Sequence, residues 1–167
     1  MSNYPLEIII PVYNEGKNIR RVLECFNLKV KTRFRILIVY DNEDDNTINN
    51  FNSLDYNYEI VKLKNNESGA HSAIMTGMNY SESDSVIIFP ADDIINQNII
   101  DKMYAKFVHG ADVVVASRFI KGGSMKGCPL LKSILVRSAS WTLYLFSSIP
   151  VRDASNGFRL FSRKILD

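Results

Sequence analysis

The chain has 167 residues, of which 46% are hydrophobic and 23% charged, and its formal net charge at pH 7 is +2. This composition excludes a disordered chain, and the length fits one domain with a sizeable core. The small net charge gives no indication of a nucleic-acid partner, and we expect none. Cys25 and Cys128 lack metal-ligand spacing and favour a cytoplasmic location, and no apolar run reaches the roughly 18 residues of a membrane span.

Apolar runs and amphipathic segments alternate along most of the chain. The runs predict strands at Leu6 to Ile10, Phe34 to Tyr40, Tyr58 to Leu63, Val86 to Phe89, Val113 to Ala116 and Phe158 to Ser162. The segments between them predict helices near residues 19–26, 45–54, 69–77, 99–107 and 131–146. Strand and helix alternate five times, which predicts an α/β fold with a mostly parallel, doubly wound sheet flanked by helices.

Polar side chains follow three of these strands directly. They are Tyr13, Asn14 and Glu15 after the first, Asp41 after the second, and Asp92 and Asp93 after the fourth. Ligands of open α/β sheets bind at the carboxyl ends of the strands, so these residues mark a candidate site. The alternative is that the acidic pair only caps the next helix.

The type of ligand follows partly from two absent motifs. The sequence contains neither a dinucleotide-binding glycine fingerprint nor a P-loop. Carboxylates at a sheet edge suit a hydrated divalent metal with a diphosphate, and Asp41 or Glu15 can accept hydrogen bonds from a base or ribose.

A second feature is a long stretch without acidic residues. Between Asp112 and Asp153 the charged residues are all basic: Arg118, Lys121, Lys126, Lys132, Arg137 and Arg152. This pattern fits a phosphate-binding wall, and it equally fits a solvated surface. Beside an apolar helix with Trp141 and Tyr144, it also suits an anionic membrane surface.

Five motifs together resemble the family 2 glycosyltransferases of the GT-A fold. They are I-I-I-P-V-Y-N-E at 8–15, V-Y-D-N-E-D-D-N-T at 39–47, P-A-D-D at 90–93, V-A-S-R-F-I-K-G-G at 115–123 and D-A-S-N-G-F-R-L-F at 153–161. The last two are similar to the dolichyl- or polyprenyl-phosphate sugar transferases. The resemblance implies one GT-A (Rossmann-like) domain over 1–167, with a nucleotide-sugar-binding part at 1–117 and an acceptor-side part at 118–167. We expect the second part to be incomplete.

The resemblance also implies roles for individual residues. The expected nucleotide-binding residues are Pro11, Tyr13, Asn14, Glu15 and Asp41. Asp92 is expected to ligate Mg²⁺ or Mn²⁺ together with Asp93, because Pro90 stands where the family motif begins with an aspartate. The residues expected to hold the acceptor phosphate are Arg118, Lys121 and Arg159. The chain also departs from the family pattern at Tyr40 and Lys132.

The implied reaction is displacement at the anomeric carbon of the donor sugar, with a nucleoside diphosphate as leaving group. The expected catalytic residues are Asp92, Arg118 and Asp153, the last as general base for a hydroxyl acceptor. A lipid phosphate needs no strong base, because its second pKa of about 6 leaves it largely ionised at pH 7. Asp153 alternatively caps a turn.

Three functional interpretations follow. The first is a transferase that uses a nucleotide-sugar donor and a polyprenyl-phosphate acceptor, peripheral at the cytoplasmic membrane face. The second is a family 2 transferase with a saccharide hydroxyl acceptor. The third is a non-catalytic nucleotide-sugar-binding module. The sequence gives no indication of the oligomeric state.

Overall fold

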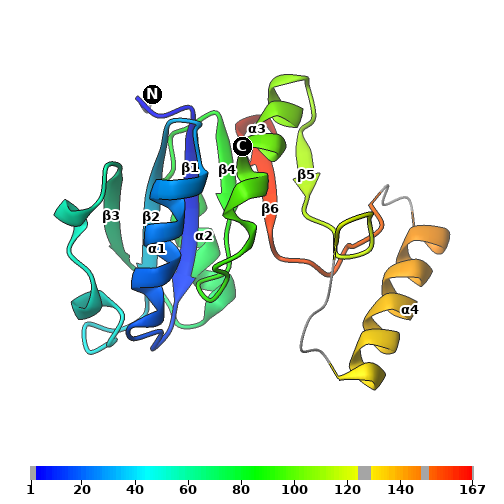
Figure 1. The fold of residues 1–167 in the computed structure, drawn as a ribbon, viewed down its shortest axis with the longest axis horizontal. Coiled ribbons are helices and arrows are strands. Elements are labelled where there is room, and N and C mark those ends of the chain that lie inside the picture. The colour runs from blue at the N-terminus through cyan, green and yellow to red at the C-terminus, as the bar shows by residue number, and fades with distance from the viewer. Residues whose placement is uncertain (1–2, 124–128, 148–150, 167) are drawn as a thin grey trace.

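One six-stranded sheet forms the centre of the computed structural model, which describes residues 3–123, 129–147 and 151–166 (Figure 1). The strands are β1 (Leu6–Val12), β2 (Phe34–Tyr40), β3 (Glu59–Lys64), β4 (Ser85–Ile88), β5 (Val113–Val115) and β6 (Arg159–Ser162). Their spatial order is β3-β2-β1-β4-β6-β5. All six lie within about two residues of the ranges expected from the apolar runs.

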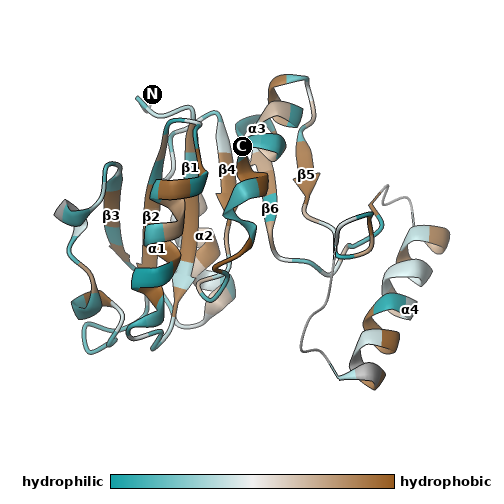
Figure 2. Ribbon diagram, in the orientation of Figure 1, coloured by the Kyte–Doolittle hydropathy of each residue, from teal (hydrophilic) through white to brown (hydrophobic). Residues whose placement is uncertain are grey.

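The first four strands are parallel, as the alternation of strands and helices predicts. Ile8 of β1 is level with Ile36 of β2 and with Ile87 of β4, and all three side chains are fully buried. These central strands are covered on both faces, which explains their nearly continuous apolar sequences (Figure 2). Their carboxyl ends therefore lie along one edge of the sheet.

The last two strands differ from the simple doubly wound pattern. β6 lies between β4 and β5 and is antiparallel to both. Arg159, the first residue of β6, is level with Ile88 near the end of β4 and with Val115 at the end of β5. The segment that leads into β6 therefore reaches the same edge as the carboxyl ends of β4 and β5.

Helices cover both faces of the sheet. Helices α1 (Asn18–Lys29) and α3 (Ile100–Val108) bury their apolar sides with the even-numbered residues of β1 and β2. Helix α2 (Ala70–Tyr80) packs on the opposite face, where its core contacts include Ile9 and Leu37. A Cβ atom at Gly77 would lie 2.7 Å from Cγ2 of Ile9, so glycine lets α2 approach the sheet closely.

The segment expected as a helix near 45–54 forms only short 3-10 turns. These are η1 (Ile48–Asn50) and η2 (Ser53–Asp55). Elsewhere in the described chain, 3-10 turns occur at η3 (Asn96–Ile99) and η4 (Arg163–Ile165). Phe51, between η1 and η2, is buried.

Helix α4 (Leu130–Phe146) stands away from the sheet (Figure 1). Its exposed apolar residues with helical spacing are Leu131, Ile134, Leu135, Trp141 and Leu145. Within the part of the chain that the structure describes, no helix has both the length and the apolar character needed to cross a membrane.

Candidate functional site

A pocket of about 630 Å³ opens at the carboxyl ends of β1 and β2. Its lining residues are Pro11, Val12, Tyr13, Glu15, Asp41, Ser68, Gly69, Ala70 and Ala73. Four of the five residues expected at the nucleotide therefore line one cavity, and only Asn14 does not. The contribution of residues 68–73, at the amino end of α2, was not foreseen from the sequence. The small residues Ser68, Gly69 and Ala70, where the loop after the third strand meets the next helix, could have indicated it.

Asp41 connects β2 to the far wall of this pocket. Its Oδ1 accepts a hydrogen bond from Nδ2 of Asn65 at 2.6 Å, and its Oδ2 accepts one from the backbone N–H of Gly69 at 2.9 Å. Asn65 is itself buried and receives hydrogen bonds from the hydroxyls of Ser72 and Thr76. Asp41 is thus held in place while it remains part of the pocket lining.

The loop after β1 is fixed by the loop after β2. The carboxylate of Asp45, which is 4% exposed, accepts hydrogen bonds from the backbone N–H of Asn14 at 3.1 and 3.2 Å. The hydroxyl of Thr47 accepts one from the N–H of Glu15 at 3.0 Å. Asn14 has a φ of 54°, a left-handed conformation that asparagine tolerates. The loop after β2 therefore positions Tyr13 and Glu15, a role that the spacing of residues in the sequence did not reveal.

The two aspartates after β4 differ in their surroundings. Asp93 accepts hydrogen bonds from the backbone N–H groups of Ile95 and Asn96 and from the side-chain amide of Asn96. These contacts are those of a capping residue at the start of η3. Asp92 is exposed and, within the described residues, makes no hydrogen bond or ion pair.

The negative charges of Asp92 and Asp45 both act on Glu15. Partial burial raises the pKa of Glu15 above its ordinary value, and the negative charges of Asp92 and Asp45 raise it further. Glu15 belongs to the pocket lining, so Asp92 acts electrostatically on the pocket. A cation near Glu15 and Asp92 would relieve this repulsion.

The residues present fit a divalent cation that is held partly by the protein and partly by the phosphate oxygens of a bound nucleotide. Within the described parts of the chain, no three His, Cys, Asp or Glu side chains converge closely enough to enclose a metal ion. Mg²⁺ in nucleotide sites commonly has one or two protein carboxylates, with water and phosphate oxygens as its other ligands. The oxygens of Asp92 are available for that role.

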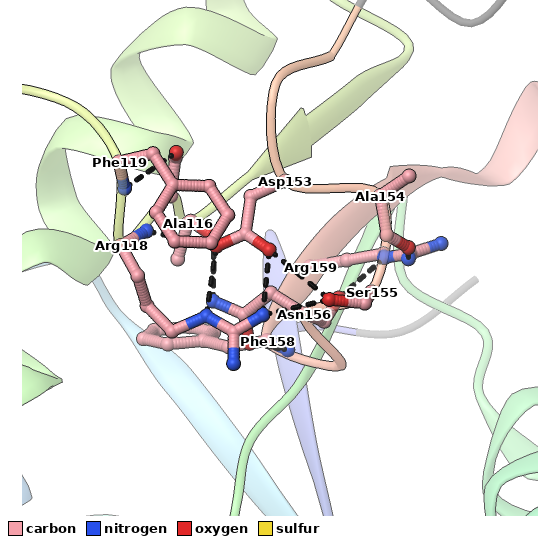
Figure 3. A network of polar contacts seen from close by, with 10 residues as sticks. Ala116, Arg118, Phe119, Asp153, Ala154, Ser155, Asn156, Phe158 and Arg159 are labelled. Carbon is pink, nitrogen blue, oxygen red and sulfur yellow. Dashed lines mark hydrogen bonds and ion pairs between the residues drawn. The ribbon is translucent and has the colours of Figure 1, made fainter. Parts of the chain in front are cut away.

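The segments after β5 and before β6 meet at the same edge (Figure 3). The backbone N–H and the Nε of Arg118 each donate to Oδ2 of Asp153 at 2.9 Å, and its Nη2 donates to Oδ1 at 2.6 Å. The same Nη2 donates to the hydroxyl of Ser155 at 2.8 Å. Phe89 and Phe158, whose rings are 4.9 Å apart, connect this segment to the end of β4.

Asp153 is fully buried beneath Arg118. Burial alone would raise the pKa of Asp153, but the hydrogen bonds and positive charge of Arg118 outweigh it and hold that pKa below its ordinary value. An ionised carboxylate with a lowered pKa is a weak proton acceptor at neutral pH. The hydrogen bonds of Asp153 to Arg118 suit a carboxylate that orients this arginine.

The other residues expected at the acceptor are placed differently. Lys121 is exposed in the loop after β5. Arg159 points into its own turn, where its guanidinium donates to the backbone carbonyls of Asn156 and Ala154 (Figure 3). Lys126 lies outside the described residues.

Comparisons with known proteins agree with this architecture. The family described as "Glycosyl transferase family 2" matches residues 7–167. The dolichol-phosphate mannosyltransferase of Pyrococcus furiosus is 23% identical over 97% of this chain and 47% of its own length. A UDP-N-acetylglucosamine–dolichyl-phosphate N-acetylglucosaminyltransferase of Methanococcus voltae is 28% identical over 99% of this chain and 72% of its own length. The chain spans about half the length of several curated relatives it matches.

Solved structures show the same fold at low sequence identity. Glucosyl-3-phosphoglycerate synthase from Mycobacterium tuberculosis, in a complex with Mn²⁺, UDP and glucosyl-3-phosphoglycerate, superposes with a TM-score of 0.68 at 14% identity. That match covers 98% of this chain and 58% of the synthase chain. TarS from Staphylococcus aureus superposes with a TM-score of 0.62 at 16% identity, over 94% of this chain and 46% of its own. From the match over residues 7–167, the chain belongs to glycosyl transferase family 2 and has its GT-A fold.

Proposed function

We propose that this chain transfers a sugar from a nucleoside-diphosphate sugar to a polyprenyl phosphate of the dolichyl type. The observation that carries the proposal is the shared sheet edge. The pocket with Asp41 and Glu15 and the exposed Asp92 lie there with the guanidinium of Arg118. One side of the edge suits a nucleotide with a cation, and the other suits an anionic acceptor. The names of the archaeal relatives, which are dolichyl-phosphate transferases, support this acceptor class.

The donor would occupy the pocket between β1, β2 and α2. Asp41 and Glu15 provide acceptor oxygens for a base or ribose, and Pro11 and Tyr13 provide apolar surface. Asp92 would hold Mg²⁺ or Mn²⁺, which supplies charge neutralisation for the departing diphosphate. We reassign Asp93 to capping of η3, because its carboxylate already accepts three hydrogen bonds.

The acceptor would bind beside Arg118. A guanidinium held by Asp153 is pre-oriented, so less entropy is lost when it binds a phosphate. We assign Asp153 the role of positioning Arg118 rather than that of general base. A phosphate monoester is already largely ionised at neutral pH, so no residue has to remove a proton from it. Helix α4 exposes an apolar stripe, and the residues after β5 include the exposed cations Lys121, Arg137 and Arg152. Together they would suit the surface of an anionic membrane.

The first prediction separates the two adjacent aspartates. Asp92→Asn should abolish the part of nucleoside-diphosphate affinity that depends on Mn²⁺, because it removes the proposed ligand. Asp93→Ala should keep that dependence and lower the stability by about 0.5–2 kcal/mol, the usual cost of a lost helix cap. Calorimetric titration of UDP and GDP with and without Mn²⁺, together with thermal unfolding, measures both effects. Asp92 is not the ligand if its variant keeps the full Mn²⁺ dependence.

The second prediction tests the acceptor side and the reaction itself. Arg118→Ala should reduce sugar transfer to a short-chain polyprenyl phosphate by about 100-fold, as expected for a charge-assisted contact of about 3 kcal/mol. The change also leaves the buried Asp153 without its guanidinium, so the variant is assayed below its lowered Tm, where its affinity for nucleoside diphosphates should stay close to that of the wild type. Arg118→Lys should recover only part of the rate, because an ammonium cannot reproduce the bidentate guanidinium geometry.

The assay compares the three proteins at low and moderate salt, with a saccharide as the alternative acceptor. Equal rates for all three with the lipid phosphate would contradict the assignment of Arg118. Transfer to the saccharide alone would favour a hydroxyl acceptor. Nucleotide-sugar binding without transfer to either would favour a non-catalytic module.

The third prediction concerns the carboxylates around the donor pocket. A carboxyl group whose pKa is raised by folding costs stability when ionised, and this cost is absent below its ordinary pKa and complete above the raised one. Glu15→Gln should therefore raise the Tm at neutral pH, because it removes the charge whose ionisation costs stability. The difference from the wild type should vanish below pH 4.5, the ordinary pKa of the group.

Scanning calorimetry at both pH values measures the change. Glu67→Gln, which removes an exposed carboxylate, is the matched control and should leave the Tm unchanged at both. A Glu15→Gln variant that is less stable than the wild type at neutral pH would show that burial and the nearby negative charges do not destabilise the ionised Glu15.

A further inference from the structure

The ring of Phe119 lies against two guanidinium groups, one from the adjacent Arg118 and one from Arg137 in α4. The Cζ of Arg118 is 5.5 Å from the centre of this ring, and the Cζ of Arg137, in α4, is 5.3 Å from it. The two guanidinium carbons are therefore no farther apart than the sum of these distances. Attraction between a cation and an aromatic ring stabilises both contacts and connects α4 to the loop after β5.

The two arginines have different electrostatic surroundings. Arg118 donates to both carboxylate oxygens of Asp153, so its charge is largely balanced. Arg137 is exposed and has no ion pair within the described residues. The sequence has no acidic residue between Asp112 and Asp153, and Asp153 is fully buried under Arg118. The cluster of Arg118, Phe119 and Arg137 therefore carries a net positive charge next to the proposed acceptor site.

We propose that Arg137 is a second anion-binding residue of this site, held against Phe119, and that its ligand is the phosphate monoester of a prenyl chain. This inference rests on the proposed function, of which it specifies the acceptor side. The contact with Phe119 does not use the N–H donors of Arg137, so they can bind phosphate oxygens. At physiological salt the Debye length is about 8 Å, so a dianion beside the ring would feel both arginines.

The surroundings of Arg137 favour a phosphate that carries an apolar chain over free phosphate. Arg137 belongs to the helix that exposes Leu131, Ile134, Leu135, Trp141 and Leu145. A prenyl phosphate has a dianionic head and an apolar chain, and both parts find matching side chains on one helix. Inorganic phosphate would use the arginines only.

The experiment measures the Kd of the purified protein for geranyl phosphate by calorimetry at low salt. Arg137→Gln should raise this Kd by about three- to tenfold, the range expected for one exposed charge–charge contact. Phe119→Leu should raise it as well, because Arg137 loses its aromatic support, whereas Phe119→Tyr should keep the wild-type value. The Kd for nucleoside diphosphates should be the same in all these variants.

The matched control is Arg33→Gln. Arg33 is also exposed and lies 5.0 Å from the centre of the Tyr4 ring, but at the amino-terminal end of the sheet. It undergoes the same change of charge and should leave the Kd for geranyl phosphate unchanged. Geraniol and inorganic phosphate, as further probes, should both bind more weakly than geranyl phosphate.

Each outcome bears on a distinct claim. Equal Kd values for Arg137→Gln and Arg33→Gln, or a wild-type protein that does not bind geranyl phosphate, would overturn the inference. Equally tight, Arg137-dependent binding of inorganic phosphate would overturn the assignment of the ligand as a prenyl phosphate. If geranyl phosphate bound through Arg137 but no sugar were ever transferred to it, the site would stand and the proposed function would fall.

Discussion

The proposed acceptor half of the edge depends on the ion pair between Asp153 and Arg118. Asp153 is fully buried, and a buried carboxylate without a partner would typically cost about 3–5 kcal/mol. Arg118 satisfies it with two side-chain hydrogen bonds and one from the backbone. Arg118 lies in the loop after β5, and Asp153 lies in the segment before β6. The pair therefore fixes this loop on this segment. The hydrogen bonds by which Arg118 compensates the buried charge also hold its guanidinium in one orientation at the edge.

Strand topology places this pair at the same edge as the proposed donor pocket. β6 runs antiparallel between β4 and β5, so the segment before it returns to the edge at which β1, β2 and β4 end. On the donor side, Asp45 and Thr47 bind the backbone of Asn14 and Glu15 in a comparable way. Each half of the candidate site thus has an internal polar anchor, and we propose that different groups bind the ligands: Glu15 and Asp92 on one side and Arg118 on the other. The central claim is that donor and acceptor meet across this edge.

Much of this arrangement could be predicted from local sequence patterns. Continuous apolar runs located the strands, and β2 has the bounds expected for it. Because the carboxyl ends of parallel strands share an edge, Glu15, Asp41 and Asp92 could be grouped without a structure. The direction of β6 could not be predicted, because an apolar run has the same pattern in parallel and antiparallel pairing.

Long-range partners also lay beyond local patterns. Arg118 and Asp153 are 35 positions apart, and Asp45 is 31 from Asn14, so their contacts depend on the folded topology. The different environments of Asp92 and Asp93 were likewise hidden, since neighbouring aspartates look alike in sequence and only one of them meets the N–H groups of η3. The contact of Phe119 with Arg137 required the position of α4, which lies apart from the sheet.

The most direct test of the shared edge is the effect of bound Mn²⁺ on the ³¹P resonance of geranyl phosphate. Mn²⁺ is paramagnetic and broadens the signals of nearby nuclei, and a nucleoside diphosphate should retain it at Asp92. If donor and acceptor sites adjoin, the geranyl phosphate signal should broaden strongly in the ternary complex, and this broadening should disappear in Asp92→Asn. Broadening no greater than that caused by the same concentration of free Mn²⁺ would contradict the shared edge.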